Sequence, residues 1–193
     1  MKTFAIGDIH GAYKALLQCL ERSNFNKKED TLIQLGDVAD GWSEVYECVE
    51  ELLSIPNLIA IKGNHDDWFN DWLIHGGHPC NWLQGGFGTL SSYCKNLGCV
   101  YFGTDHSGYR TSLNSAVIPQ AHKDFFKNQK LYHIDYMNRC YTHGGFDRSN
   151  FVDYLAITNP VEFYWNRSLY KSALSCVGDQ KLKTANEFKE IFI

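Results

Sequence analysis

Short apolar runs separated by polar and glycine-rich segments dominate the first third of the chain. The runs at residues 3–6, 31–35 and 58–61 have the length and composition of buried β-strands. Between them, residues 13–23 and 43–53 place apolar side chains at the i, i+3 and i+4 spacing of an amphipathic helix. Strand, helix and strand in close succession predict βαβ units and therefore a parallel sheet.

The rest of the chain alternates further helix-like and strand-like segments, which predict an α/β fold. The helix-like segments are 66–74, 89–97, 119–126 and the part after Pro160, and the strand-like segments are 131–134, 139–141 and 188–193. Residues 100–108 have no clear period and receive no assignment. No internal repeat, low-complexity segment or linker divides the sequence, so we expect a single domain over residues 1–193.

The composition is that of one globular domain of ordinary size. The 193 residues are 44% hydrophobic and 21% charged, which allows a sizeable core. A net charge of −4 gives no broad attraction to nucleic acid or to an acidic membrane. No apolar run reaches the length that spans a bilayer. We therefore expect neither a membrane nor a nucleic acid as a partner.

The cysteines and the N-terminus favour a cytoplasmic protein. The seven cysteines are scattered, odd in number and without a Cys-x-x-Cys pair, which is typical of reduced and mostly buried thiols. Cys99 and Cys140 lie next to aromatic, strand-like residues, so we interpret both as core residues. The chain opens directly on strand-like sequence, with no signal-peptide pattern.

Each of the three predicted N-terminal strands leads into a glycine followed by residues that can bind metals. The three segments are Gly7-Asp8-Ile9-His10-Gly11, Gly36-Asp37-Val38-Ala39-Asp40 and Gly63-Asn64-His65-Asp66. An acid, one spacer and a histidine form half of a metal site, and an extended segment would aim both side chains the same way. Ligands of open α/β sheets collect at the carboxyl ends of the strands. The pattern therefore favours a shared metal site over core packing.

These motifs, in this order, resemble the calcineurin-like metallophosphoesterase superfamily. They are most similar to its phosphoprotein-phosphatase branch, especially the small bacterial and phage-lambda-type enzymes. The segment Tyr141-Thr142-His143-Gly144-Gly145 is similar to the family's His-Gly-Gly element, and Trp165-Asn166-Arg167 to its Trp-x-Arg. The resemblance covers most of the chain. It implies a mixed β-sandwich flanked by helices, and a hydrolase of phosphate esters that depends on two divalent metal ions.

The resemblance assigns the metal ligands. Asp37 corresponds to the carboxylate that bridges the two ions. Asp8 and His10 would complete the first site, and Asn64 and His143 would complete the second. Two ions about 3.5–4 Å apart neutralise phosphate charge, generate hydroxide near neutral pH and place it in line with the leaving group. Mixed oxygen and imidazole ligands suit Mn, Fe or Zn without choosing among them.

The resemblance also implies a proton donor and groups that bind phosphate. His65 would protonate the leaving oxygen, and Asp40 would orient its imidazole. The alternative role for His65 is a structural hydrogen bond beside Asn64. Arg167 of the Trp-x-Arg element, Lys62 and Asn64 are the candidates that would bind the phosphate oxygens.

Two departures from the family pattern bear on substrate and metal binding. Relatives have Asp-Arg-Gly where this chain has Asp40-Gly41-Trp42. A bidentate arginine is therefore missing, which puts protein-phosphatase specificity in question. Relatives also have a final Gly-His after a last strand, and its histidine completes the second metal site. This chain stops at Ile193, so we expect a truncated form with an incomplete C-terminal part.

Three other candidates have simpler explanations. His75 and His78 lie in a Gly/Pro loop without an adjacent carboxylate, so we expect them to face solvent rather than to bind a metal. Arg148 is a looser candidate for binding phosphate, and we interpret it as a solvated charge.

Three functional interpretations are open. The leading one is a dinuclear phosphoesterase that hydrolyses phosphate monoesters, including phosphoserine and phosphothreonine in proteins. The second is a hydrolase of small molecules or dinucleotide polyphosphates, so that the substrate is a phosphorylated compound in both cases. The third is a non-catalytic scaffold with the same fold. A scaffold has no use for the His65–Asp40 pair, which therefore favours an enzyme.

Overall fold

The computed structural model describes residues 1–79, 81–146, 160–176 and 188–193. Its first half is built on a parallel sheet with the strand order β1-β2-β3. The strands are β1 (Thr3–Ile6), β2 (Thr31–Gln34) and β3 (Leu58–Ala60). All three follow the apolar runs of the sequence, and because they are parallel their carboxyl ends lie at one edge of the sheet.

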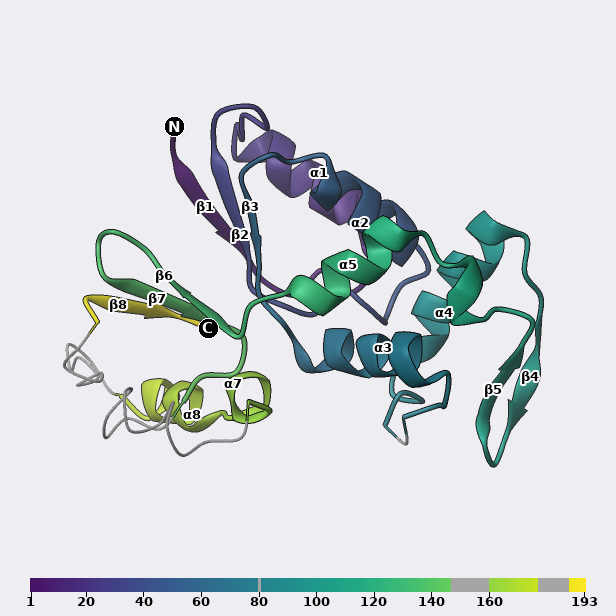
Figure 1. The fold of residues 1–193 in the computed structure, drawn as a ribbon. Helices are drawn as coiled ribbons and strands as arrows, with labels where there is room; N and C mark the ends of the chain where they lie inside the picture. Colours follow the sequence, from purple (N-terminus) through teal and green to yellow (C-terminus); the bar gives the residue numbers. More distant parts are fainter. Residues whose placement is uncertain (80, 147–159, 177–187) are drawn as a thin grey trace.

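Two crossover helices connect these strands, as the sequence predicts. They are α1 (Tyr13–Arg22) and α2 (Val45–Leu53), and they lie together on one side of the sheet (Figure 1). Each buries an apolar stripe, which includes Leu16 in α1 and Val49 in α2. Removing that stripe from water is what holds the helices on the sheet.

An aromatic core joins the sheet to three further helices. They are α3 (Asn64–His75), α4 (Gly86–Leu97) and α5 (Gln120–Asn128). Phe69 of α3 lies at its centre, with its ring 5.2 Å from that of Tyr93 and 4.9 Å from that of Phe126. Helices α3 and α4 begin two and three residues earlier than the sequence predicts. The difference matters for α3, because its first turn then contains Asn64 and His65.

The unassigned stretch of the sequence forms a hairpin. Strands β4 (Tyr101–Asp105) and β5 (Gly108–Thr111) pair antiparallel and extend away from the rest of the domain (Figure 1). Most β4 side chains are exposed on both faces, so the strand lacks the alternation that would have predicted it. An irregularity between Tyr101 and Gly103 further disturbs the pattern. The hairpin is followed by a short 3-10 helix, η1 (Ser115–Val117).

A second three-stranded sheet follows, with the order β6-β7-β8. It contains β6 (Tyr132–Ile134), β7 (Arg139–Thr142) and β8 (Glu190–Phe192). Strands β6 and β7 form the expected hairpin, with β8 parallel to β7. Helices α7 (Glu162–Trp165) and α8 (Ser168–Leu174) accompany it.

The two three-stranded sheets share a small apolar cluster. Ile33 of β2 and Tyr141 of β7 are buried in it, and Phe192 of β8 stacks on Tyr141 with ring centroids 4.8 Å apart. Packing between two sheets, with helices outside them, confirms the expected mixed α/β architecture.

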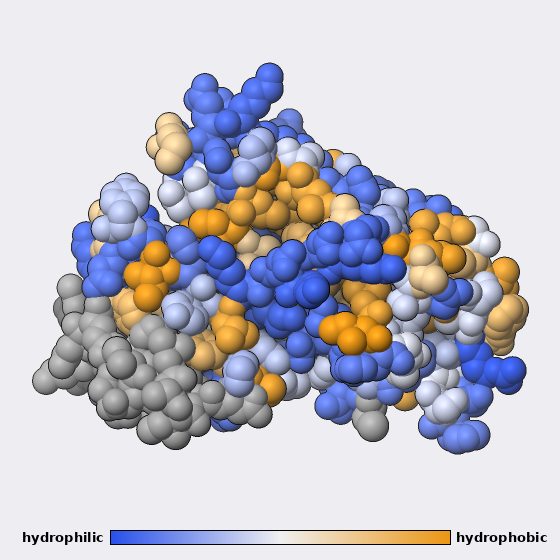
Figure 2. Space-filling view, viewed as in Figure 1, coloured by the Kyte–Doolittle hydropathy of each residue, from blue (hydrophilic) through white to orange (hydrophobic). Residues whose placement is uncertain are grey.

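The surface and the thiols add little that is unusual. Figure 2 shows apolar residues gathered beside α5, where a cavity of about 380 Å³ is lined by residues that include Leu58, Ile59 and Phe125. In the described part of the chain the cysteines are free, with Cys48 and Cys140 buried as reduced core thiols would be. None of the described helices has the length and apolar character needed to cross a membrane.

Candidate active site

Asp66, in the first turn of α3, holds the loop that follows β2. Its Oδ1 accepts the N–H groups of Val38 and Ala39 at 2.8 and 2.9 Å, and its Oδ2 accepts that of Asp37 at 2.9 Å. Gln129 donates a further hydrogen bond to Oδ2 at 2.8 Å. A fully buried carboxylate requires such partners. Helix α3 thereby fixes the position of Asp37.

Three candidate residues have backbones in the left-handed region. The φ angles are 47° for His10, 58° for Asp37 and 71° for Asp40. Such conformations cost on the order of 1–3 kcal/mol each for residues with a Cβ atom, and they persist only where the surrounding structure enforces them. Their concentration in the two candidate loops is typical of a functional site.

A turn, and not an extended strand, brings Asp8 and His10 together. Strand β1 ends at Ile6, and the N–H groups of Ile9 and His10 both donate to the carbonyl oxygen of Asp37, at 3.0 and 2.9 Å. The alternation expected from the sequence is therefore wrong for this segment. The two side chains still approach each other, with 3.9 Å between His10 Nε2 and Asp8 Oδ2.

Two glycines make room for the side chains. A Cβ atom on Gly63 would overlap the carboxylate of Asp37, and one on Gly36 would lie 2.7 Å from His143 Nδ1. Gly36 also has a φ of 104°, which side chains rarely tolerate. Both glycines of the sequence motifs are thus required by close approach to a candidate ligand.

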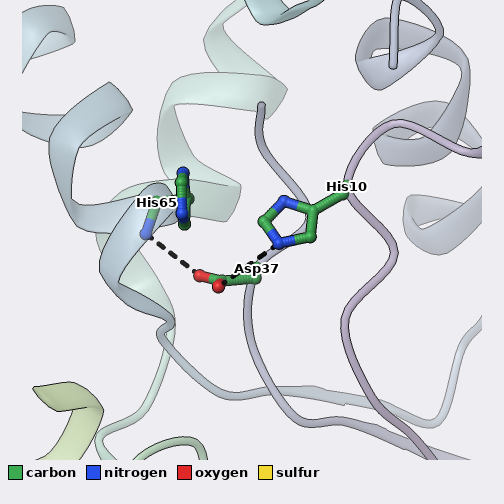
Figure 3. A group of neighbouring side chains, drawn as sticks. All are labelled: His10, Asp37 and His65. Carbon is green, nitrogen blue, oxygen red and sulfur yellow. Dashed lines mark hydrogen bonds and ion pairs between the residues drawn. The ribbon is translucent and has the colours of Figure 1, made fainter. Parts of the chain in front are cut away.

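His10 points its Nε2 atom at the carboxylate of Asp37. Its Nδ1 lies 2.9 Å from the carbonyl oxygen of Ala39, which can only accept, so Nδ1 carries the proton. Its Nε2 then faces Asp37 Oδ2 at 3.6 Å (Figure 3). Two electron-rich atoms that face each other at this distance are suited to bind a cation between them.

His143 repeats this arrangement from the second sheet. Its Nδ1 donates to the carbonyl oxygen of Leu35 at 2.9 Å. Its Nε2 is 3.4 Å from Asp37 Oδ2 and 3.2 Å from Asn64 Oδ1. In the neutral ring with its proton on Nδ1, Nε2 carries a lone pair, so Nε2 and the two oxygens are all electron donors. These contacts fit a second cation.

The potential ligands form two groups that share Asp37. The side chains of Asp8, Asp37 and His143 can each supply a ligand atom within 4.8 Å of the others, and so can those of His10, Asp37 and His65. The carboxylate of Asp37 is almost fully buried, and burial raises its pKa despite the opposing effect of His143. A bound cation would favour the ionised form of this carboxylate.

The position of His65 admits two roles. Its Nδ1 lies 2.8 Å from Asp40 Oδ2. Its backbone N–H donates to Asp37 Oδ1 at 3.0 Å (Figure 3). Burial lowers the pKa of His65, but the hydrogen bond to Asp40 and the charges of Asp37 and Asp66 outweigh it, so the pKa is raised. The ring can therefore donate a proton, or supply a metal ligand beside His10.

The residues that the sequence links to metal binding and proton transfer thus converge at one edge of the parallel sheet, where β7 adds His143. A family model described as calcineurin-like phosphoesterase matches residues 1–166. The chain belongs to the calcineurin-like phosphoesterase family.

Relatives with assigned names fall into two kinds. Serine/threonine-protein phosphatase 2 of Salmonella typhimurium is 38% identical over 84 residues, which are 39% of this chain and 38% of that protein. The symmetrical bis(5'-nucleosyl)-tetraphosphatase of Buchnera aphidicola is 38% identical over 78 residues, which are 40% of this chain and 28% of that protein. The matched segments therefore span well under half of either relative.

Two solved structures support the fold. A protein assigned as a diadenosine tetraphosphatase superposes with a TM-score of 0.57 and 18% identity, over 84% of this chain and 57% of its own. A serine/threonine phosphatase from Saccharomyces cerevisiae with similarity to human PP5 superposes with a TM-score of 0.52 and 19% identity. This match covers 84% of this chain and 48% of that chain.

The two charged candidates for phosphate binding, Arg167 and Lys62, lie in different surroundings. Arg167 lines a cavity of about 230 Å³ together with Asp8 and His143, and its Nη1 donates to the carbonyl oxygen of Tyr164 at 3.1 Å. Among the described residues, no carboxylate lies within 4.0 Å of its guanidinium group. Arg148 lies outside the described residues.

Lys62 is occupied elsewhere. Its Nζ donates to the carbonyl oxygen of Phe126 at 3.3 Å and lies 3.6 Å from Asp67 Oδ1. These contacts hold the ammonium group on α3 and α5, whereas Arg167 lines the cavity beside the candidate metal ligands Asp8 and His143. Arg167 is the better placed of the two for a phosphate.

The two loop histidines differ. His75 is exposed, with Asp71 3.5 Å away, as expected of a solvent-facing residue. The same expectation is wrong for His78, whose ring is half-buried and packs 4.9 Å from that of Trp82 and 5.2 Å from that of Tyr109. The missed hairpin explains the error, because β5 covers this loop.

Sequence reasoning also missed residues that support the site. Asp66 stands inside the Gly-Asn-His-Asp segment, so its place beside two candidate residues was an available signal. Trp82 and Thr89 both donate hydrogen bonds to Asp40 Oδ1. No local pattern distinguishes Trp82 from a core tryptophan.

Proposed function

We propose that the chain is a hydrolase of phosphate esters that uses two divalent metal ions. The observation that carries the proposal is the carboxylate of Asp37, whose Oδ2 faces the Nε2 atoms of His10 and His143 at 3.6 and 3.4 Å. A single carboxylate between two such nitrogens suits a bridging ligand. When bound, the ions would supply positive charge to the phosphate and make water at the site more acidic.

The remaining ligands complete each ion's set. Asp8 and His10 would hold the first ion with Asp37, while Asn64 and His143 would hold the second. The carbonyl oxygens of Ala39 and Leu35 fix the tautomers of the two histidines. Oxygen and imidazole ligands of this kind suit Mn, Fe or Zn.

The other residues act on the substrate itself. Arg167, beside Asp8 and His143 in the cavity, would bind phosphate oxygens. His65 would protonate the leaving oxygen, and Asp40 would hold its imidazole in the required tautomer. This division of roles argues for an enzyme over a scaffold, because a scaffold needs no oriented proton donor.

The preferred substrate is a phosphate monoester, with phosphoserine and phosphothreonine as the leading class. Dinucleotide polyphosphates are the alternative, because one kind of relative acts on them by name. Gly41, which stands where relatives have an arginine, bears on the choice between these two substrate classes. It removes a bidentate arginine, and the adjacent Trp42 is 70% exposed, which offers an indole for stacking. Lys62, held by Phe126 and Asp67, is not needed for phosphate in either case.

The test is metal-dependent hydrolysis of a substrate panel. The panel contains a phosphopeptide, a simple alkyl phosphate, an activated aryl phosphate and a dinucleotide tetraphosphate. Activity should disappear with a chelator and return with excess Mn. Asp37→Asn should abolish binding of a metal pair, measured by elemental analysis, because the bridge loses its charge.

Asp30→Asn is the matched control for that variant. Asp30 is a buried carboxylate just before β2, outside the site, where it accepts the N–H groups of Lys2 and Asn26. This variant should keep both ions. Two tightly held ions in Asp37→Asn, or hydrolysis that survives complete removal of metal, would contradict the proposal.

A further inference from the structure

We propose that Thr89 and Trp82 are positioning residues for the proton donor, acting through Asp40. They would hold one oxygen of this carboxylate so that the other is presented to His65 Nδ1. The inference rests on the proposed role of His65 as proton donor. It assigns a role to Trp82 and to Thr89 near the start of α4, which neither metal binding nor phosphate binding uses.

The two oxygens of Asp40 have separate partners. Oδ1 accepts hydrogen bonds from the Nε1–H of Trp82 at 2.9 Å and from the hydroxyl of Thr89 at 2.7 Å. Oδ2 lies 2.8 Å from His65 Nδ1. With two donors already on Oδ1, the carboxylate is fixed about its own axis and directs Oδ2 towards the imidazole.

The direction of the Thr89 hydroxyl is determined by a second contact. The backbone N–H of Asp40 donates to Thr89 Oγ1 at 2.7 Å, so this oxygen accepts from the backbone. Its own proton is then free to point to Oδ1. One threonine thus binds both the main chain and the side chain of Asp40, whose φ of 71° requires such restraint.

Trp82 reaches Asp40 from a different direction and is itself held firmly. Its ring is fully buried, with Trp72 at 5.6 Å and Tyr109 of β5 at 5.8 Å. A Cβ atom on Gly86 would lie 2.6 Å from the indole, so the first residue of α4 closes the remaining side. The β4–β5 hairpin therefore contributes to the site by packing on the ring that holds Asp40.

A purely structural role would look similar in one respect. A fully buried carboxylate needs hydrogen-bond donors whatever its function, because an unsatisfied one is costly. The two roles differ in what happens at His65 when a donor is removed from a protein that still folds. The positioning role requires that the His65 ring loses its fixed hydrogen bond and that proton donation suffers.

The first test is nuclear magnetic resonance of the metal-free protein with labelled histidines. The Nδ1–H of His65 should give a slowly exchanging, downfield proton signal in the wild type. Thr89→Val and Trp82→Phe should weaken or shift it, and Thr89→Ser should retain it because the hydroxyl is kept.

Two controls match the chemistry of these changes. Ser92→Ala removes a buried hydroxyl from the same helix, where it accepts from the Tyr46 N–H and donates to Glu47. Trp72→Phe removes a buried indole that packs on Trp82 without reaching Asp40. Both should leave the His65 signal unchanged. An unchanged signal in Thr89→Val and Trp82→Phe, or equal losses in the controls, would overturn the inference.

The second test compares leaving groups. With an alkyl phosphate, Thr89→Val should lower kcat by roughly 10-fold or more at nearly constant KM, within the 10–100-fold typical of residues that orient another group. An activated aryl phosphate needs less proton donation, so its kcat should fall much less. Equal losses on both esters would overturn the positioning role.

The two tests separate this inference from the proposed function. If the wild type hydrolyses no ester but Thr89→Val and Trp82→Phe lose the His65 signal, the proposed function is contradicted and the positioning of His65 is supported. Wild-type hydrolysis with an unaffected signal and unaffected kcat in both variants would support the function and contradict the positioning.

Discussion

Among the described residues, the hydrogen-bonded pairs His65–Asp40 and His122–Glu50 distribute burial in opposite ways. In the first pair Asp40 is 0% exposed at its side chain and His65 is 19% exposed. In the second pair, between α5 and α2, His122 is 0% exposed and Glu50 is 56% exposed. The candidate active site thus buries the carboxylate and leaves the imidazole accessible, whereas the core does the reverse.

The ring nitrogens explain what this difference means. His122 uses both of them, because Nδ1 accepts from the Tyr93 hydroxyl at 2.8 Å and Nε2 donates to Glu50 at 2.7 Å. His65 uses Nδ1 for Asp40, and no described residue is hydrogen-bonded to its Nε2. A histidine needs a free nitrogen to donate a proton or to bind a metal, and only His65 has one.

The pKa values of the two rings follow the same division. Burial lowers the pKa in both. At His65 the bond to Asp40 and the charges of Asp37 and Asp66 reverse the effect. At His122 the hydrogen bond to the exposed Glu50 does not outweigh the effect of burial, so the pKa of His122 is lowered. Three carboxylates, of Asp40, Asp37 and Asp66, thus keep the His65 imidazole able to hold a proton, whereas the single carboxylate of Glu50 does not offset burial at His122.

Replacement of His65 should give the largest effect that separates the pairs. His65→Asn should lower kcat on an alkyl phosphate by roughly 10²–10⁴-fold, because the leaving oxygen loses its proton donor. The metal content should stay at two ions, measured by elemental analysis after dialysis. The same variant should lose much less activity on an activated aryl phosphate.

The metal measurement decides between the two roles that the geometry allows for His65. It can reach a group with His10 and Asp37, so a ligand role would remove an ion in the variant. A variant that holds one ion, with equal losses on both esters, would show that His65 binds metal and does not donate the proton.

Replacement of Asp40 should be milder. Asp40→Asn keeps the side-chain shape but offers His65 a weaker and ambiguous partner, so kcat should fall by roughly 10–100-fold. Steady-state kinetics with an alkyl ester would measure it. Glu50→Gln is the matched change at the other pair, and hydrolysis should be unaffected by it. A comparable loss in both variants would mean that the pairs do not differ in function.

The sequence anticipated one of these pairs and not the other, for physical reasons. Asp40 and His65 stand at the ends of adjacent strands in motifs with fixed spacing, so local sequence carried the information. His122 and Glu50 lie 72 residues apart on helix faces that look like ordinary amphipathic stripes. Their contact depends on how α2 and α5 pack, which periodicity does not specify.

The same distinction holds for the fold. The apolar strands β1 to β3 and their crossover helices were predictable, because the hydrophobic pattern matches the burial. The β4–β5 hairpin was not, because most β4 side chains are exposed and the Tyr109 ring of β5 packs on Trp82, which is distant in sequence. The left-handed turn at His10 was missed as well, since nothing in an Asp-x-His spacing distinguishes a turn from an extended segment.

Removal of the Tyr93 hydroxyl should affect stability and leave activity unchanged. Tyr93→Phe leaves His122 Nδ1 buried without its donor, which should cost about 1–3 kcal/mol in the free energy of unfolding. Urea denaturation would measure it. Tyr46→Phe is the control, because that ring also packs on His122, at 4.6 Å, but is less buried. Equal destabilisation by both would argue that the loss does not come from the hydrogen bond to His122.

The smallest expected effect is a pH dependence of stability that comes from His122. Its folded pKa is lowered from the usual 6.5, with burial as the main cause. Below about pH 6.5 the unfolded chain therefore binds a proton that the folded protein does not, and the free energy of unfolding falls as the pH falls towards the folded pKa. The groups that face the ring are Glu50, Tyr46 and Tyr93, and burial raises the pKa values of both tyrosines above 10, so neither titrates here.

The measurement is urea denaturation of the metal-free protein at several pH values between about 4 and 7.5, the range around the usual histidine pKa. His122→Gln should flatten the acid side of the profile, although it lowers stability at neutral pH. His75→Gln is the control, because that side chain is 68% exposed and its removal should leave the profile unchanged. If the free energy of unfolding of His122→Gln falls at acid pH as steeply as that of the wild type, then other groups cause the pH dependence and the His122–Glu50 pair does not contribute to it.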